Sequence, residues 1–187
     1  MISRRQMIAS SSALAALGVS SAARAQGATC AVFDKSSQAA TSPDQALARL
    51  KEGNERFSNG KTVNCDLMSQ VKATSGQQSP VACVVGCIDS RVPPELVFDQ
   101  RLGDIFAARV AGNFVNTDII GSLEFATKLA GAKVIVVLGH TECGAIKGAV
   151  DDAKLGNLTA TLANIRPSLT QLNYSALPSS NNKEPVQ

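Results

Sequence analysis

The sequence predicts an α/β fold in which a parallel-cored β-sheet is flanked by helices. Three short apolar runs, at 81–86, 104–109 and 133–139, have the length of buried strands and alternate with segments of helical character. Strands that alternate with helices favour right-handed crossovers and a parallel sheet. The chain has 187 residues, 4% aromatic residues and no tryptophan, so we expect one domain with a core of Val, Ile, Leu and Ala.

Residues 1–25 are predicted to be a signal peptide that lies outside this domain. Arg4 and Arg5 precede an apolar stretch at 8–19, and the Ala-Arg-Ala triplet at 23–25 fits a cleavage site. The apolar stretch is too short and too rich in serine to span a bilayer. The paired arginines resemble a twin-arginine signal, with an ordinary Sec signal or an uncleaved leader as the alternatives. We therefore expect a periplasmic protein with no membrane attachment after cleavage.

The formal net charge of +3 belongs to this leader, which contains Arg4, Arg5 and Arg24 and no acidic residue. The remaining chain carries equal numbers of basic and acidic residues. A chain without excess positive charge gives no electrostatic basis for binding nucleic acid or an anionic membrane surface. We therefore expect neither class of partner.

The domain is expected to span residues 42–172, between a flexible polar segment at 26–41 and a polar tail at 173–187 that should be disordered. Two helices should precede the first strand, and the others should follow or separate the three strands. In chain order, the expected helices cover residues 43–59, 65–73, 94–98, 117–131, 143 onward and 158–165.

Local signals predict the ends of the first helix. Ser42 can cap it, Pro43 suits its first turn, and Gln45 stands at the capping-box position. The Asn-Gly pair at 59–60 should end it. After the first strand, the two prolines at 93–94 cannot continue an extended ladder, so we expect a short helix there.

The helix at 117–131 carries equally clear signals. Thr117 stands at the cap position, Asp118 lies in the first turn, and Gly131 should end the helix. Its apolar residues fall at helical spacing and should face the core. These residues are Ile119, Ile120, Leu123, Ala126 and Leu129.

Two of the apolar strands lead into residues that bind soft metal ions. The first strand is followed by the motif Cys-Ile-Asp-Ser-Arg, which begins at Cys87, and the third by His140 and Cys143. The carboxyl ends of parallel strands meet at one edge of the sheet. Two thiolates and one imidazole form a tetrahedral zinc site with an open fourth position. The pattern therefore predicts one zinc ion per chain, held by Cys87, His140 and Cys143.

Asp89 and Arg91 alternate with Cys87, so an extended backbone would direct all three side chains to one side, beside the metal. Cys143 opens a helix, and a helix N-terminus favours a thiolate. Gly144 follows it and leaves room for a small molecule to approach the backbone. Taken alone, Asp89 and Arg91 are equally consistent with a surface ion pair of small energetic value.

The five cysteines allow other interpretations. A redox pair of Cys87 and Cys143 is the main alternative to zinc. Cys83 lies inside the first strand and is interpreted as a small apolar core residue. An odd number of cysteines does not fit a pure disulfide framework. If the zinc site is right, Cys30 and Cys65 are left over, and a disulfide between them is a hypothesis.

The two motifs together resemble those of the β-class carbonic anhydrases. Cys-x-Asp-Ser-Arg at 87–91 is followed roughly fifty residues later by His-x-x-Cys-Gly at 140–144. The resemblance extends from about residue 42 to about residue 167 and includes Gly-Asn-Glu-Arg-Phe at 53–57 and Ala-Gly-Asn at 111–113. It implies a zinc-dependent lyase that hydrates carbon dioxide reversibly to bicarbonate and a proton by means of a zinc-bound hydroxide.

The resemblance also implies roles for individual residues. Cys87, His140 and Cys143 would be the zinc ligands, and Asp89 and Arg91 the catalytic dyad beside the metal. In some family members the matching aspartate becomes the fourth zinc ligand in a closed state. The substrate pocket, commonly at the interface of a homodimer or higher even oligomer, would be lined by Gln78, Phe106, Phe125 and Gly144.

One departure from the family concerns the C-terminus. The family usually continues past the helix near 158–165 with more helix and a final strand, and we expect this fold to lack that strand. Two other functions therefore stay open beside carbonic anhydrase activity. One is hydrolysis of carbonyl sulfide or carbon disulfide on the same scaffold, and the other is a non-catalytic zinc or thiol-redox protein.

Overall fold

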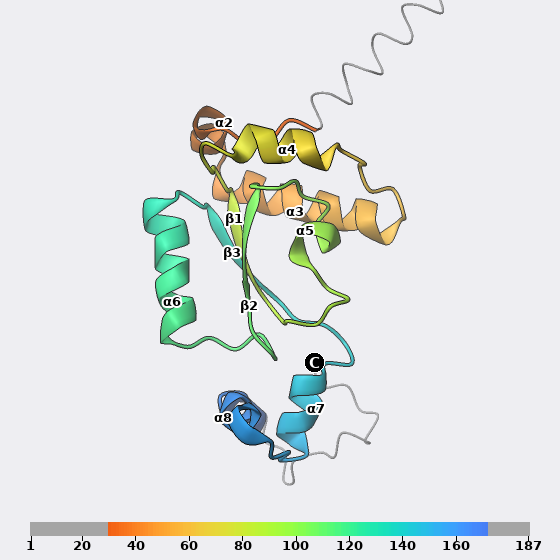
Figure 1. Cartoon of the computed structure of the whole chain (residues 1–187), viewed down its shortest axis with the longest axis vertical. Helices are drawn as coiled ribbons and strands as arrows, with labels where there is room; N and C mark the ends of the chain where they lie inside the picture. Colours follow the sequence, from red (N-terminus) through yellow and green to blue (C-terminus); the bar gives the residue numbers. More distant parts are fainter. Residues whose placement is uncertain (1–29, 172–187) are drawn as a thin grey trace, which may run out of the picture.

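The computed structural model describes residues 30–171, which form a three-stranded parallel β-sheet with helices on both faces (Figure 1). The strands are β1 (Ala82–Gly86), β2 (Ile105–Arg109) and β3 (Val134–Leu138). The order is β2-β1-β3, and Gly86 at the end of β1 lies opposite both Arg109 and Leu138. The predicted fold class is confirmed. Within the described residues β3 is an edge strand, as expected for a sheet that lacks the usual C-terminal strand.

The helices lie on both faces and at the carboxyl end of the sheet. In Figure 1, α3 and α5 lie on one side of the strands and α6 on the other, while α7 and α8 lie beyond the carboxyl ends of the strands. The helical elements are α2 (Lys35–Ala40), α3 (Pro43–Ser58), α4 (Leu67–Thr74), α5 (Pro94–Val97), α6 (Thr117–Glu124), η1 (Phe125–Leu129), α7 (Gly144–Val150), α8 (Gly156–Ala163) and α9 (Arg166–Gln171).

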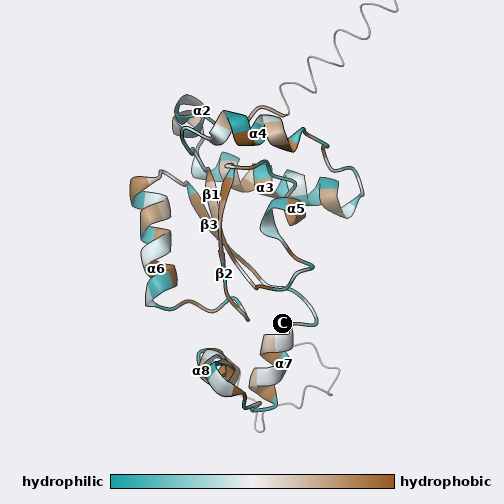
Figure 2. Ribbon diagram, viewed as in Figure 1, coloured by the Kyte–Doolittle hydropathy of each residue, from teal (hydrophilic) through white to brown (hydrophobic). Residues whose placement is uncertain are grey.

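The core is built on β1, all of whose residues are buried, as expected for a central parallel strand covered on both faces. On one face, Val84 packs with Leu50 of α3. On the other face, Cys83 packs with Ala126 of η1, which agrees with its interpretation as a core residue. Figure 2 shows hydrophobic residues along the strands, whereas the helices mix hydrophobic and hydrophilic residues.

The cap of α3 is confirmed in detail. The Gln45 amide donates to Ser42 Oγ at 3.2 Å, and the Ser42 amide donates to Gln45 Oε1 at 2.8 Å, which completes a capping box. Asn59 is the C-cap, and Gly60 follows with a positive φ of 65°. A residue without Cβ adopts this backbone conformation without strain.

The helix predicted at 117–131 differs from expectation in two ways. Its cap is Asn116, whose side chain accepts the Ile119 amide at 3.0 Å, and it widens into the π-helical turn η1 after Glu124. Of the five residues expected to face the core, only Ala126 is buried, whereas Ile120 and Leu129 are 49% and 78% exposed. The wider turn changes the direction of the following side chains, and no described segment covers the outer face of the helix.

The segment at 26–41 was expected to be flexible, but its described part contains the helix α2. Asp34 caps this helix by accepting the Ser37 amide at 2.8 Å. The buried Gln38 side chain donates to the carbonyl oxygens of Pro80 and Ala130, at 2.5 and 2.8 Å. These long-range hydrogen bonds hold α2 against the rest of the domain, and no local sequence pattern predicts them.

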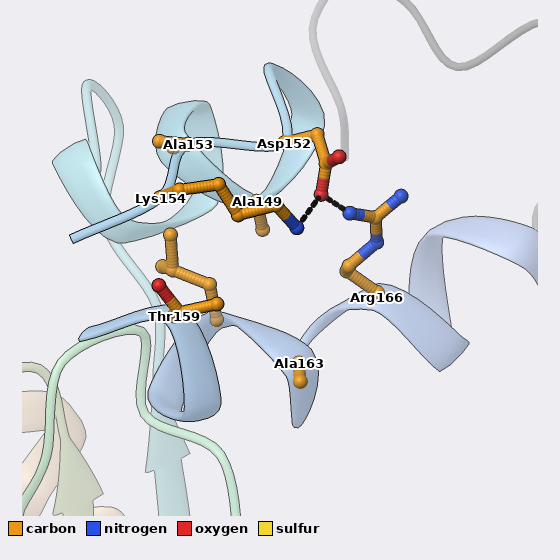
Figure 3. A pocket seen from close by; sticks show the side chains of 9 residues that line it. Ala149, Asp152, Ala153, Lys154, Thr159, Ala163 and Arg166 are labelled. Atoms are coloured by element: carbon orange, nitrogen blue, oxygen red, sulfur yellow. Dashed lines mark hydrogen bonds and ion pairs between the residues drawn. The ribbon is translucent and has the colours of Figure 1, made fainter. Parts of the chain in front are cut away.

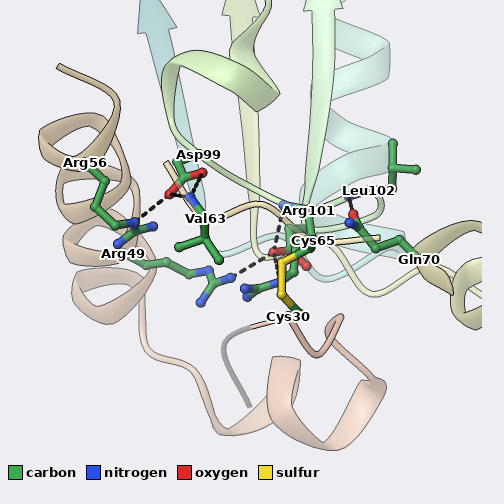
Figure 4. The surroundings of a disulfide bond; sticks show 10 residues. Cys30, Arg49, Arg56, Val63, Cys65, Gln70, Asp99, Arg101 and Leu102 are labelled. Atoms are coloured by element: carbon green, nitrogen blue, oxygen red, sulfur yellow. Dashed lines mark hydrogen bonds and ion pairs between the residues drawn. A yellow bond between two sulfur atoms is a disulfide. The ribbon is translucent and has the colours of Figure 1, made fainter. Parts of the chain in front are cut away.

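A disulfide joins Cys30 to Cys65, in agreement with the hypothesis from the cysteine count (Figure 4). Three residues after Cys30, the Phe33 amide donates to the fully buried Asp104 at 3.4 Å, and Arg49 Nη2 donates to Asp104 at 2.8 Å. The Arg49 guanidinium also lies 4.8 Å from the centre of the Phe33 ring. The N-terminal segment is thus held at the end of the sheet where the strands begin.

The helices α7, α8 and α9 form a small cluster of their own around Ala149, Leu162 and Ile165. They enclose a cavity of about 200 Å³, shown in Figure 3. At its rim Asp152 pairs with Lys154 at 2.6 Å and with Arg166. This cluster extends the domain beyond the last predicted helix.

Two sequence predictions fall outside the described residues: the signal peptide at 1–25 and the disordered tail at 173–187. Between residues 30 and 171, no helix combines the length and apolar character that crossing a membrane requires. Within the described residues, the sheet brings both sequence motifs to its carboxyl edge.

Candidate metal centre

Cys87, His140 and Cys143 meet at the carboxyl edge of the sheet. Cys87 directly follows β1, His140 follows β3, and Cys143 is the N-cap of α7. Their ligand atoms all lie within 4.8 Å of one another, and the Sγ atoms of Cys87 and Cys143 are 3.9 Å apart. The structure therefore brings together the three residues that the sequence predicts as ligands.

The arrangement of these atoms fits a tetrahedral zinc ion. Two thiolates bound to one zinc at about 2.3 Å place their sulfur atoms about 3.8 Å apart, close to the separation in this chain. His140 Nδ1 donates to the Thr141 carbonyl oxygen at 2.8 Å, which orients the ring. His140 Nε2 is buried without a hydrogen bond to any described residue, so its lone pair is free to bind a metal.

The two thiols differ in acidity. Burial opposes ionisation of Cys87, but the Gly112 amide at 3.3 Å favours it, and the pKa of Cys87 falls to about 7. Burial raises the pKa of Cys143, although the amides of Ile146 and Ala145 act in the opposite direction. The expected effect of the α7 N-terminus on Cys143 is present but smaller than the effect of burial.

Asp89 and Arg91 form a bidentate pair. Arg91 Nε donates to Asp89 Oδ1 at 2.9 Å and Arg91 Nη2 donates to Oδ2 at 2.7 Å. The Arg91 side chain holds the pKa of the Asp89 carboxyl well below its usual range. Asp89 Oδ2 lies 4.0 Å from His140 Nε2, and Arg91 Nη2 donates to the Glu142 carbonyl oxygen at 3.4 Å, so the pair also joins the two motifs.

The pair is assembled differently from the sequence prediction. Residues 87–89 lie outside β1, and the chain turns at 90–91 instead of continuing as an extended strand. The Val92 amide donates to the Asp89 carbonyl oxygen at 3.2 Å and closes this turn. A turn, and not strand alternation, therefore places Asp89 and Arg91 beside the ligands.

The four predicted pocket residues do not form one pocket within the chain. Phe106 and Phe125 meet edge to face, with ring centres 6.1 Å apart, and line an open cavity of about 620 Å³ between β2 and α6. Gly144 is exposed beside Cys143, with open space where a Cβ would lie. Gln78 is exposed and precedes β1, whereas Cys87 follows it, so the two residues lie at opposite ends of the same strand.

Two residues for which the sequence predicted no role in the site, Arg109 and Gly112, also contact the centre. Arg109 closes β2, and its guanidinium reaches the backbone around Cys87. Gly112, with a φ of 79°, presents its amide to Cys87 Sγ. For Arg109, the one sign in the sequence was the position of a charged residue at the end of an otherwise apolar strand.

The sequence matches the family described as "Carbonic anhydrase" over residues 82–187. A carbonic anhydrase 2 of Mycobacterium tuberculosis is 41% identical over 119 residues, which cover 63% of this chain and 58% of that protein. A carbonic anhydrase of Mycolicibacterium smegmatis is 38% identical over 135 residues, covering 69% of this chain and 66% of that protein. This chain thus spans about three fifths of the length of these curated relatives.

Solved structures agree on the fold. A Coccomyxa β-carbonic anhydrase in complex with acetazolamide superposes with a TM-score of 0.53 at 26% identity, over 69% of this chain and 59% of that chain. The β-carbonic anhydrase CafA of Aspergillus fumigatus gives a TM-score of 0.51 at 28% identity, over 68% and 60%. The sheet order, the ligand geometry and the family match lead to one conclusion: the chain belongs to the β-class carbonic anhydrase family.

Proposed function

We propose that this protein is a zinc-dependent carbonic anhydrase that converts carbon dioxide and water reversibly to bicarbonate and a proton. The observation that carries the proposal is the Cys87–His140–Cys143 group with the Asp89–Arg91 pair beside it. A redox pair of cysteines would need neither a histidine with a free Nε2 nor an adjacent carboxylate held by an arginine. Membership of the family supports the same reaction.

Zinc would be held by the two thiolates and by His140 Nε2, one ion per chain. Bound there, zinc would supply the Lewis acid that makes a water molecule nucleophilic at neutral pH. The Gly112 amide stabilises the thiolate of Cys87, and the Thr141 carbonyl oxygen orients His140. The ligands are thus pre-oriented by the chain itself, which lowers the cost of organising them around a cation.

Asp89 would act as a hydrogen-bond acceptor for the nucleophilic water. Arg91 donates two side-chain hydrogen bonds to Asp89 and keeps the carboxylate ionised, so Asp89 accepts hydrogen bonds but has no proton to donate. The orientation of that water, and hence of its attacking lone pair, follows from the fixed position of the carboxylate. To become a fourth metal ligand, Asp89 would have to give up contacts with Arg91, so the present arrangement favours the open state.

A homodimer, or a higher even oligomer, is part of the proposal. On the uncovered face of β3, Ile135 and Val137 are 44% and 61% exposed, and Phe125 of η1 is 47% exposed. Burial of such side chains against a second copy would stabilise the assembly. In such an assembly, Gln78 of one chain could lie beside the candidate metal centre of the other chain. In solution, Val137→Lys should shift the mass measured by light scattering toward the monomer, and an unchanged mass would contradict this face as the interface.

We further propose export to the periplasm by the twin-arginine route, which carries folded proteins. The Cys30–Cys65 disulfide supports a final location in an oxidising compartment. Zinc loading before export would protect Cys87 and Cys143 from oxidation. Replacing the leader with a Sec signal should therefore lower the zinc content of the periplasmic protein, and full zinc occupancy would count against the route.

The decisive experiment combines a zinc count with a stopped-flow assay of carbon dioxide hydration. The purified oligomer should contain about one zinc per chain and catalyse hydration, while Asp89→Ala should retain zinc and lose most of the rate. A parallel assay with carbonyl sulfide and carbon disulfide distinguishes the hydrolase reaction. Zinc-loaded protein without hydration activity would refute the proposal.

A further inference from the structure

Arg109, at the end of β2, contacts the backbone of the motif that begins at Cys87 and follows β1. It is the last residue of β2 and stands opposite Gly86, the last residue of β1. Its Nε donates to the Cys87 carbonyl oxygen at 2.8 Å, and its Nη2 donates to the Asp89 carbonyl oxygen at 2.6 Å. One guanidinium thus binds the backbone at both a candidate metal ligand and the neighbouring carboxylate residue.

These two hydrogen bonds belong to a longer set of contacts between the end of β2 and this motif. The Val110 amide donates to the Gly86 carbonyl oxygen at 3.0 Å, and the Gly112 amide donates to Cys87 Sγ at 3.3 Å. β1 ends at Gly86, so the hydrogen bonds between strands do not extend to the backbone that follows. Arg109 supplies side-chain hydrogen bonds to that backbone instead.

We propose that Arg109 is a positioning residue, which fixes the distance and orientation between the metal ligand Cys87 and the Asp89 carboxylate. This inference rests on the proposed function, because it assigns Arg109 a role in the same centre. The planar guanidinium holds its donors in a rigid fork, so two carbonyl oxygens bound to it are held at a defined separation. The donors of an ammonium group rotate freely, so a lysine at this position could not impose that separation.

Asp89 shows how the effect would be transmitted. Its carbonyl oxygen binds both Arg109 and the Val92 amide, and that amide closes the turn on which Arg91 lies. Arg91 in turn fixes the Asp89 carboxylate. Loss of Arg109 would therefore free the start of the turn and loosen the carboxylate relative to the ligands.

The test compares Arg109→Gln and Arg109→Lys with a control, Arg56→Gln. Arg56 pairs with Asp99 at 2.5 Å through a half-buried guanidinium, and neither residue contacts the centre, so its loss reports on the stability of the fold alone. For each purified protein we would measure zinc affinity by competition with a chelator, the visible spectrum after cobalt substitution, and kcat and KM for hydration.

Arg109→Gln should bind metal about 10–100-fold more weakly, shift the cobalt spectrum and lower kcat more than KM. Arg109→Lys should give intermediate values, and Arg56→Gln should match the wild type in all three measurements. A wild-type cobalt spectrum and metal affinity in Arg109→Gln would overturn the inference. If that variant does not fold, Arg109→Lys decides, and its identity with the wild type would overturn the inference as well.

The cobalt spectrum and the metal affinity separate this inference from the proposed function. Wild-type protein that binds metal but does not hydrate carbon dioxide would refute the function while leaving the positioning role measurable. Active wild-type protein together with an unperturbed Arg109→Gln variant would refute the positioning role alone.

Discussion

Cys87 Sγ and Cys143 Sγ lie 3.9 Å apart, although the two cysteines are 56 positions apart in the chain. This is about the separation of two thiolates on one tetrahedral zinc and too long for a disulfide, whose sulfur atoms are about 2.0 Å apart. The parallel pairing of β1 and β3 produces this proximity, since each cysteine follows the carboxyl end of one of these strands. The two sulfur atoms are therefore placed by the sheet and not by local sequence.

The first prediction concerns metal content. Cys143→Ser should reduce zinc from about one ion per chain to near zero, because it removes one of the three ligands. Cys83→Ala, a buried cysteine inside β1, is the matched control and should retain its zinc. Elemental analysis of both proteins after exhaustive dialysis measures the difference. Full zinc occupancy in Cys143→Ser would argue against this ligand set.

The second prediction concerns Asp89. Asp89→Asn keeps the size of the side chain but removes its charge, so it should lower the hydration rate by about 100-fold without loss of zinc. Asp44→Asn, in the exposed first turn of α3, is the control and should keep the wild-type rate. Equal rates for the two variants would exclude Asp89 from the reaction.

The third prediction is a titration. After removal of metal under reducing conditions, the Cys87 thiolate should appear as the pH rises through about 7. Because this pKa is lowered by folding, the thiolate stabilises the metal-free fold at high pH, and that contribution is lost as the pH falls through about 7. The ultraviolet absorbance of the thiolate reports the transition. It should be missing in Cys87→Ser and unchanged in Cys83→Ala.

The fourth prediction concerns the Cys30–Cys65 disulfide. The double variant Cys30→Ser/Cys65→Ser should lose about 2–4 kcal/mol of the free energy of unfolding, because its unfolded chain is no longer cross-linked. Urea unfolding measures this loss. Zinc content should stay the same, since Phe33, three residues after Cys30, contacts Asp104 at the start of β2, and the candidate ligands follow the other ends of the strands. A coupled loss of zinc would show that the two ends of the sheet communicate.

The fifth prediction concerns proton release. The chain contains one histidine, His140, which is a candidate ligand, so no second histidine can carry protons to solvent. Turnover should therefore rise steeply with the concentration of external buffer until another step limits the rate. Stopped-flow measurements at constant pH and ionic strength test this, and turnover that ignores buffer concentration would contradict it.

The sequence predicted most accurately what depends on local chemistry. Ser42 and Gln45 cap α3 as expected because a capping box involves residues three positions apart. The proximity of the three candidate ligands was predictable because parallel strands bring their ends to one edge. Asp89 and Arg91 do lie beside them, but a turn places them there, and not the strand alternation that was expected.

Features that depend on distant neighbours could not be predicted. Apolar periodicity located a helix at 117–131 but not the π-helical turn, nor the exposure of Ile120 and Leu129, which depends on what covers that face. Gln38 anchors α2 through carbonyl oxygens far along the chain. Arg109 contacts backbone atoms of the segment that follows β1, so its sequence neighbours give no sign of its partners.

Gly112 ties the centre to the C-terminal helices. Its amide contacts Cys87 Sγ, while a Cβ on the same residue would lie 2.4 Å from Ile165 Cδ1. Its φ of 79° further disfavours any side chain. Both the contact with Ile165 and the positive φ therefore select against any residue other than glycine at position 112. In a saturation-mutagenesis library, the rare tolerated substitutions there should occur with a smaller residue at 165.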